Sequence, residues 1–325
     1  MQHVKVGVVG VGGMGSFHAR ALAAFAGVEV AAVADVYRPN AIAASDATGA
    51  QIVDDPFALI ADADIDAVLI ASPDDTHADL TIAAIERGLF TLCEKPLATT
   101  VDDAHRVIAA EVAADRRLVQ IGFMREFDPA HLQVLDELPA VGTIVAVRSW
   151  HRNANPSPRP VTLIVGQSLV HDVHSVRFIT GAEIESVRAS TAGIDDAIRH
   201  LTVICELSSG AHSTLEFDDC GYAYEVGVEV IGDHGDVVTG VPIRAVRRRA
   251  GSVDVHLGPD WFGWFADAYR RQDQAWINSV RDGRAAGPST WDGFVSQTVV
   301  DAILRSIESG HTVTVPVHDR PGLYA

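Results

Sequence analysis

The sequence has 325 residues, 48% of them hydrophobic, and a formal net charge of −18. This length exceeds what one hydrophobic core usually organises, so we expect two domains. The acidic balance excludes nucleic acid as a partner, because phosphates demand a basic surface.

Nothing in the sequence predicts a membrane-bound or secreted protein. The first residues lead straight into a strand-like run without the regions of a signal peptide. No apolar stretch reaches the roughly 18 residues of a membrane span without a charge or a glycine cluster. Cys93, Cys205 and Cys220 are too few and too scattered for a disulfide framework or a metal site. We therefore expect a cytoplasmic protein without a bound metal.

Up to Gly122 the sequence alternates short β-branched runs with alanine-rich segments at helical spacing. This order predicts parallel strands joined by crossover helices, a doubly wound sheet. Thr100 and Asp103 have the spacing of a capping box at a helix start. The predicted strands are Val4–Val9, Val28–Ala34, Ala67–Ala71, Phe90–Cys93 and Leu118–Phe123, and the predicted helices are Ser16–Phe25, Pro39–Thr48, Thr76–Arg87 and Val101–Ala114.

After Gly122 the regular alternation of strands and helices ends. The strands predicted from Glu185 to Thr239 follow one another without helices between them, which favours a large, mostly antiparallel open sheet. The predicted order is helix Pro129–Leu138, strand Thr143–Trp150, a Pro-rich loop at 155–160, helix His171–Ile179, strands Glu185–Ala192, His200–Leu207, Ala211–Phe217, Tyr222–Ile231 and Asp236–Thr239, helices Trp261–Val280 and Thr290–Ser309, and strand Thr312–Val317. The basic run 247–249 lies among valines and predicts a solvated strand edge. We predict an α/β protein with domains at residues 1–122 and 123–325.

A glycine-rich motif follows the first strand. Gly10, Gly12 and Gly15 form a G-x-G-x-x-G pattern directly before a helix, whose N-terminus favours phosphates. Asp35 ends the second strand, where a carboxylate binds the hydroxyls of a ribose. The pattern predicts a Rossmann dinucleotide site that prefers NAD, because a carboxylate there repels a 2′-phosphate. Arg38 could offset this repulsion, which leaves NADP possible.

Two further segments carry residues that suit redox chemistry. Lys95 lies in the tripeptide Glu94-Lys95-Pro96 after a predicted strand, where a lysine can polarise an oxygen, although a surface loop explains the tripeptide equally well. His171 and His174 are neighbours on one flank of a predicted helix. A histidine in such a helix is more often structural than a base, and no third ligand accompanies the pair for a metal.

Together these residues resemble the Gfo/Idh/MocA oxidoreductase family, and within it the inositol 2-dehydrogenase branch. The likeness extends over nearly the whole chain. The segments that carry it are the glycine-rich turn, Ser72-Pro73, Glu94-Lys95-Pro96, Gly122-Phe123-Met124-Arg125, His151-Arg152-Asn153, Tyr222-x-Tyr224 and Gly287–Gly293.

The resemblance implies a reversible hydride transfer between a ring hydroxyl of a polyol or sugar and nicotinamide. Lys95 matches the catalytic lysine and His171 the general base, and the bond before Pro96 is typically cis. The cofactor-binding positions are Gly10, Gly12, Gly13, Met14, Gly15, Asp35, Arg38, Ser72, Pro73, His77, Glu94 and Lys95. The substrate-binding positions are Met124, His151, Asn153, His174 and Tyr224.

Two positions depart from the branch pattern. Gln167 stands where the branch has an aspartate four residues before the base, and His174 replaces a second aspartate. Gln167 can still orient the base, but it cannot stabilise an imidazolium by charge. The alternatives are therefore the same chemistry on a pyranose, a glycoside or an aminocyclitol, or a non-catalytic regulator that senses the cofactor. We also expect a homo-oligomer, a dimer or tetramer, through the C-terminal sheet.

Overall fold

A computed structural model describes residues 3–154, 157, 159–194, 197–219, 223–240, 246–255 and 260–325. The chain divides into two compact units: unit 1 comprises 1–124, 269–297 and 318–325, and unit 2 comprises 125–268 and 298–317. The domain boundary at residue 122 stays a prediction, and unit 1 takes in two segments that the sequence assigned to the second domain. Asn155, Pro156, Pro158, Cys220 and Tyr222 lie outside the described residues.

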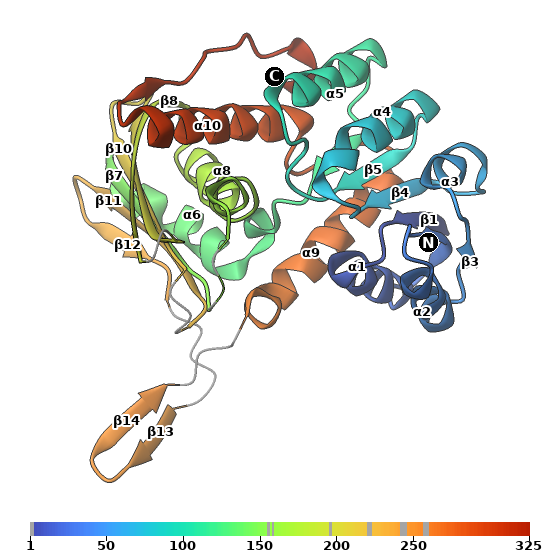
Figure 1. The fold of residues 1–325 in the computed structure, drawn as a ribbon, viewed down its shortest axis with the longest axis horizontal. Coiled ribbons are helices and arrows are strands. Elements are labelled where there is room, and N and C mark those ends of the chain that lie inside the picture. Colours follow the sequence, from blue (N-terminus) through green and yellow to red (C-terminus); the bar gives the residue numbers. More distant parts are fainter. Residues whose placement is uncertain are drawn as a thin grey trace. The chain divides into compact units, whose positions relative to one another are not determined.

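Unit 1 contains a six-stranded parallel sheet (Figure 1). Its elements are β1 (Val4–Val9), α1 (Gly13–Ala23), β2 (Val28–Ala34), α2 (Arg38–Thr48), β3 (Gln51–Ile52), α3 (Pro56–Asp62), β4 (Ala67–Ile70), α4 (His77–Arg87), β5 (Phe90–Cys93), α5 (Val101–Ala113) and β6 (Val119–Ile121). The strand order is β3-β2-β1-β4-β5-β6, so the chain reverses direction across the sheet between β1 and β4. The predicted doubly wound sheet is confirmed.

The core of unit 1 lies on both faces of this sheet, because its strands are apolar throughout. One cluster joins residues of α1 and α2 to the sheet and includes Trp276 and Ile277, while the other joins residues of α3 and α4. Helix α5 begins with the predicted cap, in which the Thr100 side chain accepts from the Asp103 N–H at 3.1 Å. Because all six strands are parallel, their carboxyl ends share one edge of the sheet.

Unit 2 contains a seven-stranded sheet. Its elements are α6 (Pro129–Val141), β7 (Ile144–Arg152), α7 (Val161–Leu163), α8 (Val170–Thr180), β8 (Ile184–Ile194), β9 (Ala197–Leu207), β10 (His212–Asp218), β11 (Glu225–Gly232), β12 (Asp236–Val238) and β15 (Val313–Thr314). The order is β12-β11-β7-β10-β9-β8-β15, and every pair is antiparallel except β7 with β10. The mostly antiparallel sheet is confirmed, although β7 separates β10 from β11.

Helices α6 and α8 cover one face of the unit 2 sheet, where alternate strand residues are buried. Helix α6 contacts β11 and β12, and α8 contacts β7 and β10. Val147, Leu215 and Val228 point into this core with at most 1% of their surface exposed. The strands place their other side chains, such as Arg148 and Ile204, on the outer face.

Several elements differ from the sequence-based expectation. The helix predicted from His171 begins ten residues earlier, after Pro160, and runs through α7 and a π-helical stretch, Ile164–Leu169, into α8. The basic run 247–249 lies in β13 (Val246–Arg249), which pairs with β14 (Ser252–Val255) as a separate two-stranded sheet. The last helices are α9 (Trp261–Asp282) and α10 (Thr290–Ser309).

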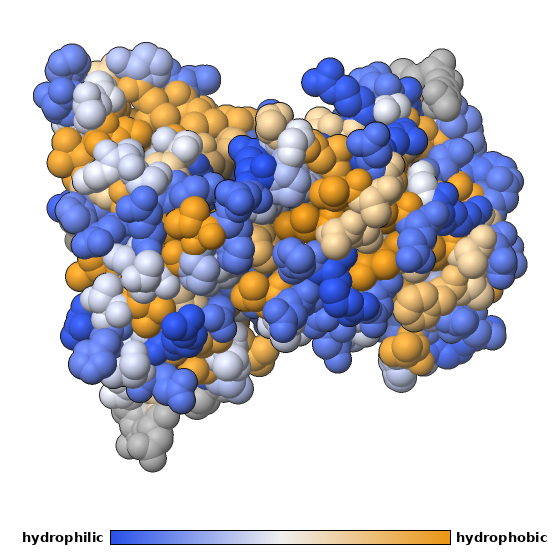
Figure 2. Space-filling view, turned by 90° about the horizontal axis from the view of Figure 1, so that it is seen from above, coloured by the Kyte–Doolittle hydropathy of each residue, from blue (hydrophilic) through white to orange (hydrophobic). Residues whose placement is uncertain are grey.

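The face of the molecule in the space-filling view carries both hydrophilic and hydrophobic side chains (Figure 2). Within the described ranges, no helix has both the length and the apolar character needed to cross a membrane.

The glycine-rich turn generates a stability prediction. A Cβ at Gly15 would lie 1.7 Å from the Gly10 carbonyl oxygen, whereas a Cβ at Gly13 would meet no heavy atom within 4 Å. We expect Gly15→Ala to lower the free energy of unfolding by at least about 2 kcal/mol, because backbone must move. Urea denaturation checks this, with Gly13→Ala as the matched control on the same turn. Equal stability of the two variants would contradict the close packing of α1 on β1.

Candidate active site

The glycine-rich turn of unit 1 forms an open cradle at the end of β1. Gly10 adopts a φ of +80°, and a Cβ there would lie 2.5 Å from the Ala71 carbonyl oxygen and from the Ser72 nitrogen. Gly12 is the N-cap of α1, makes no side-chain cap, and has no heavy atom within 4 Å of its Cβ position. The start of α1 therefore leaves open space at Gly12, and the unpaired N–H groups of a helix start suit a pyrophosphate. Met14 is half-buried in the same turn.

Asp35 fixes this turn against the end of β2. Its Oδ2 accepts from the Val11 N–H at 2.8 Å, and its Oδ1 accepts from the Tyr37 N–H at 2.8 Å. The Asn40 side-chain amide also donates to Oδ2 at 3.4 Å, so Oδ1 is the oxygen that keeps a further lone pair for a ribose hydroxyl. Arg38 forms an exposed ion pair with Asp54, which offsets its charge. The arrangement therefore favours a ribose without a phosphate.

A buried histidine ties the loop after β4 to the loop after β5. His77 is 1% exposed, its Nδ1 lies 2.7 Å from the Pro96 carbonyl oxygen, and its Nε2 lies 2.9 Å from the Ser72 carbonyl oxygen. Carbonyls only accept, so both ring nitrogens must donate and the ring is an imidazolium. Burial lowers the pKa of His77, but Cys93 and the two carbonyls outweigh it and raise the pKa to about 9. Ser72 is half-buried and Pro73 exposed.

Lys95 follows β5 in the loop that His77 contacts. Its side chain is half-buried, and the Lys95–Pro96 peptide bond is cis, as the resemblance implies. The Lys95 N–H donates to Oε2 of Glu94 at 3.2 Å, and Glu94 is 5% exposed. The glycine-rich turn, Asp35, Ser72, Glu94 and Lys95 thus all lie at the carboxyl edge of the parallel sheet.

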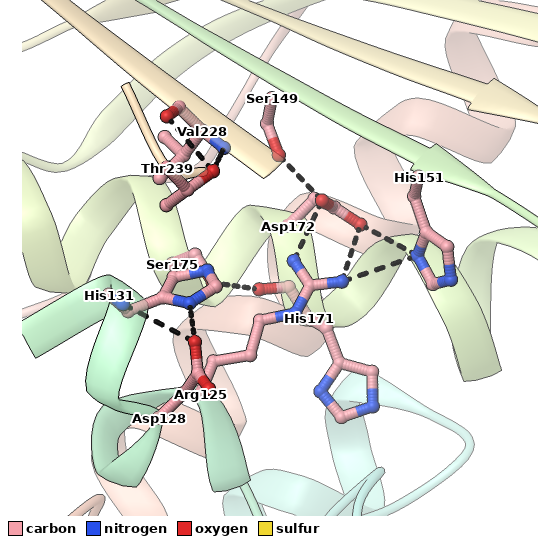
Figure 3. A network of polar contacts seen from close by, with 10 residues as sticks. All are labelled: Arg125, Asp128, His131, Ser149, His151, His171, Asp172, Ser175, Val228 and Thr239. Atoms are coloured by element: carbon pink, nitrogen blue, oxygen red, sulfur yellow. Dashed lines mark hydrogen bonds and ion pairs between the residues drawn. The ribbon is translucent and has the colours of Figure 1, made fainter. Parts of the chain in front are cut away.

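Unit 2 contains a buried network around the Asp172 carboxylate (Figure 3). Oδ1 of Asp172 accepts from Arg125 at 2.7 Å and from the Ser149 hydroxyl at 2.6 Å, and Oδ2 lies 3.1 Å from Nδ1 of His151. Asp172 is fully buried and Arg125 is 2% exposed. Burial by itself would raise the pKa of Asp172, but Arg125 and His151 hold it well below its usual range. Arg125 and Asp172 are therefore a buried ion pair.

This network fixes the tautomer of His151. Nδ1 of His151 lies 3.1 Å from the Asp172 carboxylate, which can only accept, and 3.3 Å from the Arg125 guanidinium, which can only donate. The shorter contact, with Asp172, favours the proton on Nδ1. Burial lowers the pKa of His151, helped by Arg125 and opposed by Asp172, so the neutral ring presents a lone pair at Nε2. Tyr224, which is 3% exposed, packs edge-on against this ring with centroids 5.7 Å apart. Burial raises the pKa of Tyr224, so its phenol keeps its proton.

His171 and Asp172 are neighbours on α8, but their side chains leave the helix in different directions (Figure 3). His171 is 6% exposed, and its ring points away from the Asp172 carboxylate. Gln167 lies four residues earlier, half-buried in the π-helical stretch. His174 is paired through Nε2 with Oε1 of Glu126 at 2.8 Å.

Two further positions predicted from the sequence are Asn153 and Met124. Asn153 is half-buried after β7, and its N–H donates to the Asp218 carbonyl at 2.8 Å. Met124 is 2% exposed and ends the first segment of unit 1. No three His, Cys, Asp or Glu side chains of the described ranges gather as metal ligands, and the absence of a metal stays a prediction.

The sequence reasoning missed the roles of Arg125, Ser149 and Asp172. Arg125 belongs to one of the segments that carry the family resemblance, but the sequence analysis gives no function to it or to Asp172. The available signal was two opposite charges inside apolar segments, at 123–125 and 169–173, since a buried charge needs a counterion.

Two family models match this chain. One is described as an oxidoreductase family with an NAD-binding Rossmann fold and matches residues 4–123. The other is described as the C-terminal alpha/beta domain of the same oxidoreductase family and matches residues 142–315. Both are Gfo/Idh/MocA models, so the resemblance inferred from the sequence is confirmed.

The similarity to known proteins extends over nearly the whole chain. Inositol 2-dehydrogenase 1 of Saccharopolyspora erythraea is 39% identical and inositol 2-dehydrogenase 2 is 37% identical, each covering 99% of this chain and at least 98% of the relative. A myo-inositol dehydrogenase from Lactobacillus casei, solved in complex with NAD(H) and myo-inositol, has a TM-score of 0.95 at 27% identity and full coverage of both chains.

The buried ion pair generates a second prediction. Asp172→Asn leaves the Arg125 charge buried without a counterion, and we expect it to lower the free energy of unfolding by about 3–5 kcal/mol. The matched control is Glu229→Gln, which breaks the exposed Arg148–Glu229 pair at 3.0 Å and should cost about 1 kcal/mol or less. Urea unfolding of both variants measures the difference.

The same variant has a pH signature. The native pKa of Asp172 is lowered, so its contribution is full above about pH 4, where the unfolded carboxyl is ionised, and is lost as the pH falls further. The wild type should therefore lose more stability than Asp172→Asn below this pH. Parallel pH profiles would mean that Asp172 is not held as a buried anion.

Proposed function

The chain belongs to the Gfo/Idh/MocA family of NAD-dependent oxidoreductases, and we propose that it oxidises a ring hydroxyl of an inositol-like polyol. The observation that carries this is the open cradle at Gly12 and Gly13 beside Asp35, in a chain similar over its full length to inositol 2-dehydrogenases. A bound NAD supplies the acceptor for the hydride that leaves the carbinol carbon.

The cofactor would be held by residues of unit 1. The N–H groups at the start of α1 take the pyrophosphate, and Asp35 accepts from the ribose hydroxyls. Because Arg38 is paired with Asp54, it offers little to a 2′-phosphate, which favours NAD over NADP. Met14, Ser72, Pro73 and Glu94 complete the proposed set. His77 would act through the two loops that its ring joins.

Lys95 and His171 would perform the proton chemistry. Lys95 donates to the reacting oxygen and stabilises its developing negative charge. His171 accepts the hydroxyl proton while the C–H electron pair leaves with the hydrogen, so that the carbinol becomes a ketone. Gln167 orients the base or the polyol. Asp172 cannot supply the missing charge, because Arg125, Ser149 and His151 engage its carboxylate.

The remaining residues would read the ring hydroxyls. Nε2 of His151 accepts from one hydroxyl, since Nδ1 is committed to Asp172, and the protonated phenol of Tyr224 donates to another. Asn153 and His174 of unit 2 and Met124 of unit 1 are further proposed contacts of the polyol. Arg125 is already paired with Asp172, so a substrate carboxylate finds no free guanidinium there.

We further propose that the protein acts as a cytoplasmic homo-oligomer. The outer face of the unit 2 sheet presents exposed Ile204, and Val238 is exposed in β12. Such a face commonly pairs with a second copy, giving a dimer or tetramer. The free, buried thiols of Cys93 and Cys205 suit a reducing compartment.

The proposed activity predicts a substrate profile. We expect NAD-dependent turnover with ring polyols that carry adjacent hydroxyls, weaker turnover with NADP, and little with simple hydroxy acids. Lys95→Ala and His171→Ala should each lower kcat by roughly 10²-fold or more, while calorimetry finds nearly unchanged NAD affinity. Near-full activity of either variant on the best substrate would remove that residue from the mechanism, and a preference for hydroxy acids would remove the polyol assignment.

Gln167 generates a separate prediction about pH. A carboxylate four residues before His171 would stabilise its imidazolium and raise its pKa. Since the base must be deprotonated, Gln167→Asp should move the acidic limb of the kcat/KM profile to higher pH. Gln167→Asn introduces a side chain of the same shape as aspartate but without its charge, so it should leave the acidic limb in place. Identical limbs for the two variants would mean that residue 167 does not act on His171.

A further inference from the structure

A buried imidazole in unit 1 lies between two carboxylates that are distant in sequence. Nδ1 of His18 lies 2.8 and 2.9 Å from the two carboxylate oxygens of Asp273, and Nε2 lies 3.1 Å from Oε1 of Glu94. His18 and Asp273 are fully buried. His18 comes from α1, Asp273 from α9 and Glu94 from the loop after β5. Neither His18 nor Asp273 has a role in the function proposed above.

The contacts determine the protonation state of His18. Ionised carboxylates only accept, so each ring nitrogen must donate and the ring is an imidazolium. Burial lowers the pKa of His18, but Asp273 and then Glu94 outweigh it and raise the pKa to about 10. The rings of Phe17 and Tyr269 both lie edge-on to His18, each with centroids 5.8 Å apart. Burial raises the pKa of Asp273, and the neighbouring His18 opposes that rise only in part. The two carboxyls thus share the charge of a single imidazolium.

Glu94 connects this group to the lysine loop. Its Oε1 faces His18, while its Oε2 accepts from the Lys95 backbone N–H at 3.2 Å. The space for the carboxylate depends on Gly122, because a Cβ there would lie 2.8 Å from the Glu94 carboxyl carbon. Both oxygens therefore have fixed partners. Burial by itself would raise the pKa of Glu94, but His18 and then Lys95 outweigh it and lower this pKa. The carboxylate stays an anion beside the Lys95 peptide.

We propose that Asp273 and His18 are positioning residues for Lys95, and that they act by holding the Glu94 carboxylate against the Lys95 peptide. This inference rests on the proposed function, because it gives Lys95 the reacting oxygen. Asp273 orients His18, His18 orients Glu94, and Glu94 fixes the backbone from which the Lys95 side chain extends. Neither Asp273 nor His18 touches the substrate. A displacement of about 1 Å at a catalytic group can lower the rate by roughly 10²-fold. These three successive contacts would therefore affect the rate of catalysis.

The experiment is a double-mutant cycle in kcat. Asp273→Leu removes the charge and the acceptor, and we expect it to lower kcat by about tenfold or more, with NAD affinity changed less than about twofold in calorimetry. In a Lys95→Ala background the same substitution should change kcat by less than about twofold, because the positioned group is gone. Asp273→Asn keeps a hydrogen-bonding partner for His18 and should recover most of the turnover.

A matched control separates positioning from stability. Glu111 is another fully buried carboxylate of unit 1 and accepts from the Leu118 and Val119 N–H groups and from Thr290 and Tyr324. Glu111→Gln should lower the melting temperature without lowering kcat. NMR titration of His18 adds a readout that needs no substrate: its pKa should fall in Asp273→Asn, which folds most readily, because a neutral ring then suits both neighbours.

Three outcomes would overturn the inference. The first is an equal loss of kcat from Asp273→Leu with and without the Lys95 side chain, since it would make the role purely structural. The second is an unchanged His18 pKa in Asp273→Asn, because it would mean that Asp273 does not hold the proton on the ring. The third is near-full turnover of Lys95→Ala alone, which would overturn the proposed role of Lys95 itself and so is distinguishable from the first two.

Discussion

The hydrogen bond from the Lys95 peptide to the buried Glu94 carboxylate is the interaction around which the loop after β5 is arranged. A buried anion must be fully paired, so Glu94 requires His18, and the glycine at 122 leaves room for it. The other side of the loop is held by the imidazolium of His77. Helix α10 approaches the same loop, where a Cβ at Gly293 would lie 2.8 Å from Cβ of Leu97. The segment 287–293, which the sequence links to the family, thus also has a packing role.

In unit 2, too, a buried charge is paired with a buried counterion, but here the central group is a cation. There a buried guanidinium, Arg125, is neutralised by Asp172, and the carboxylate sets the proton on His151. This engagement explains why an aspartate next to His171 does not replace the carboxylate that Gln167 lacks. In both units, buried charge pairs position groups that would touch the substrate.

Local sequence patterns predicted the parts of the fold that depend on nearby residues. The glycine-rich turn, Asp35, the Thr100 cap and the parallel strands follow from spacing within a few dozen residues, and the structure contains them. His18 and Asp273 are 255 residues apart, and no periodicity links them. The π-helical stretch at Gln167 and the insertion of β7 beside β10 depend on tertiary packing, which overrides local preference. Strand alternation predicts a buried face but not the order of strands.

The activity proposed for this protein is hydride transfer from a ring carbinol to nicotinamide. Its most direct test is to incubate the protein with NAD and an inositol that carries deuterium on its ring carbons, and to analyse both products by mass spectrometry. We expect an inosose and a reduced nicotinamide that carries the deuterium, with slower oxidation than for the unlabelled polyol. Reduced nicotinamide without deuterium, or no reduction across the ring polyols, would contradict it.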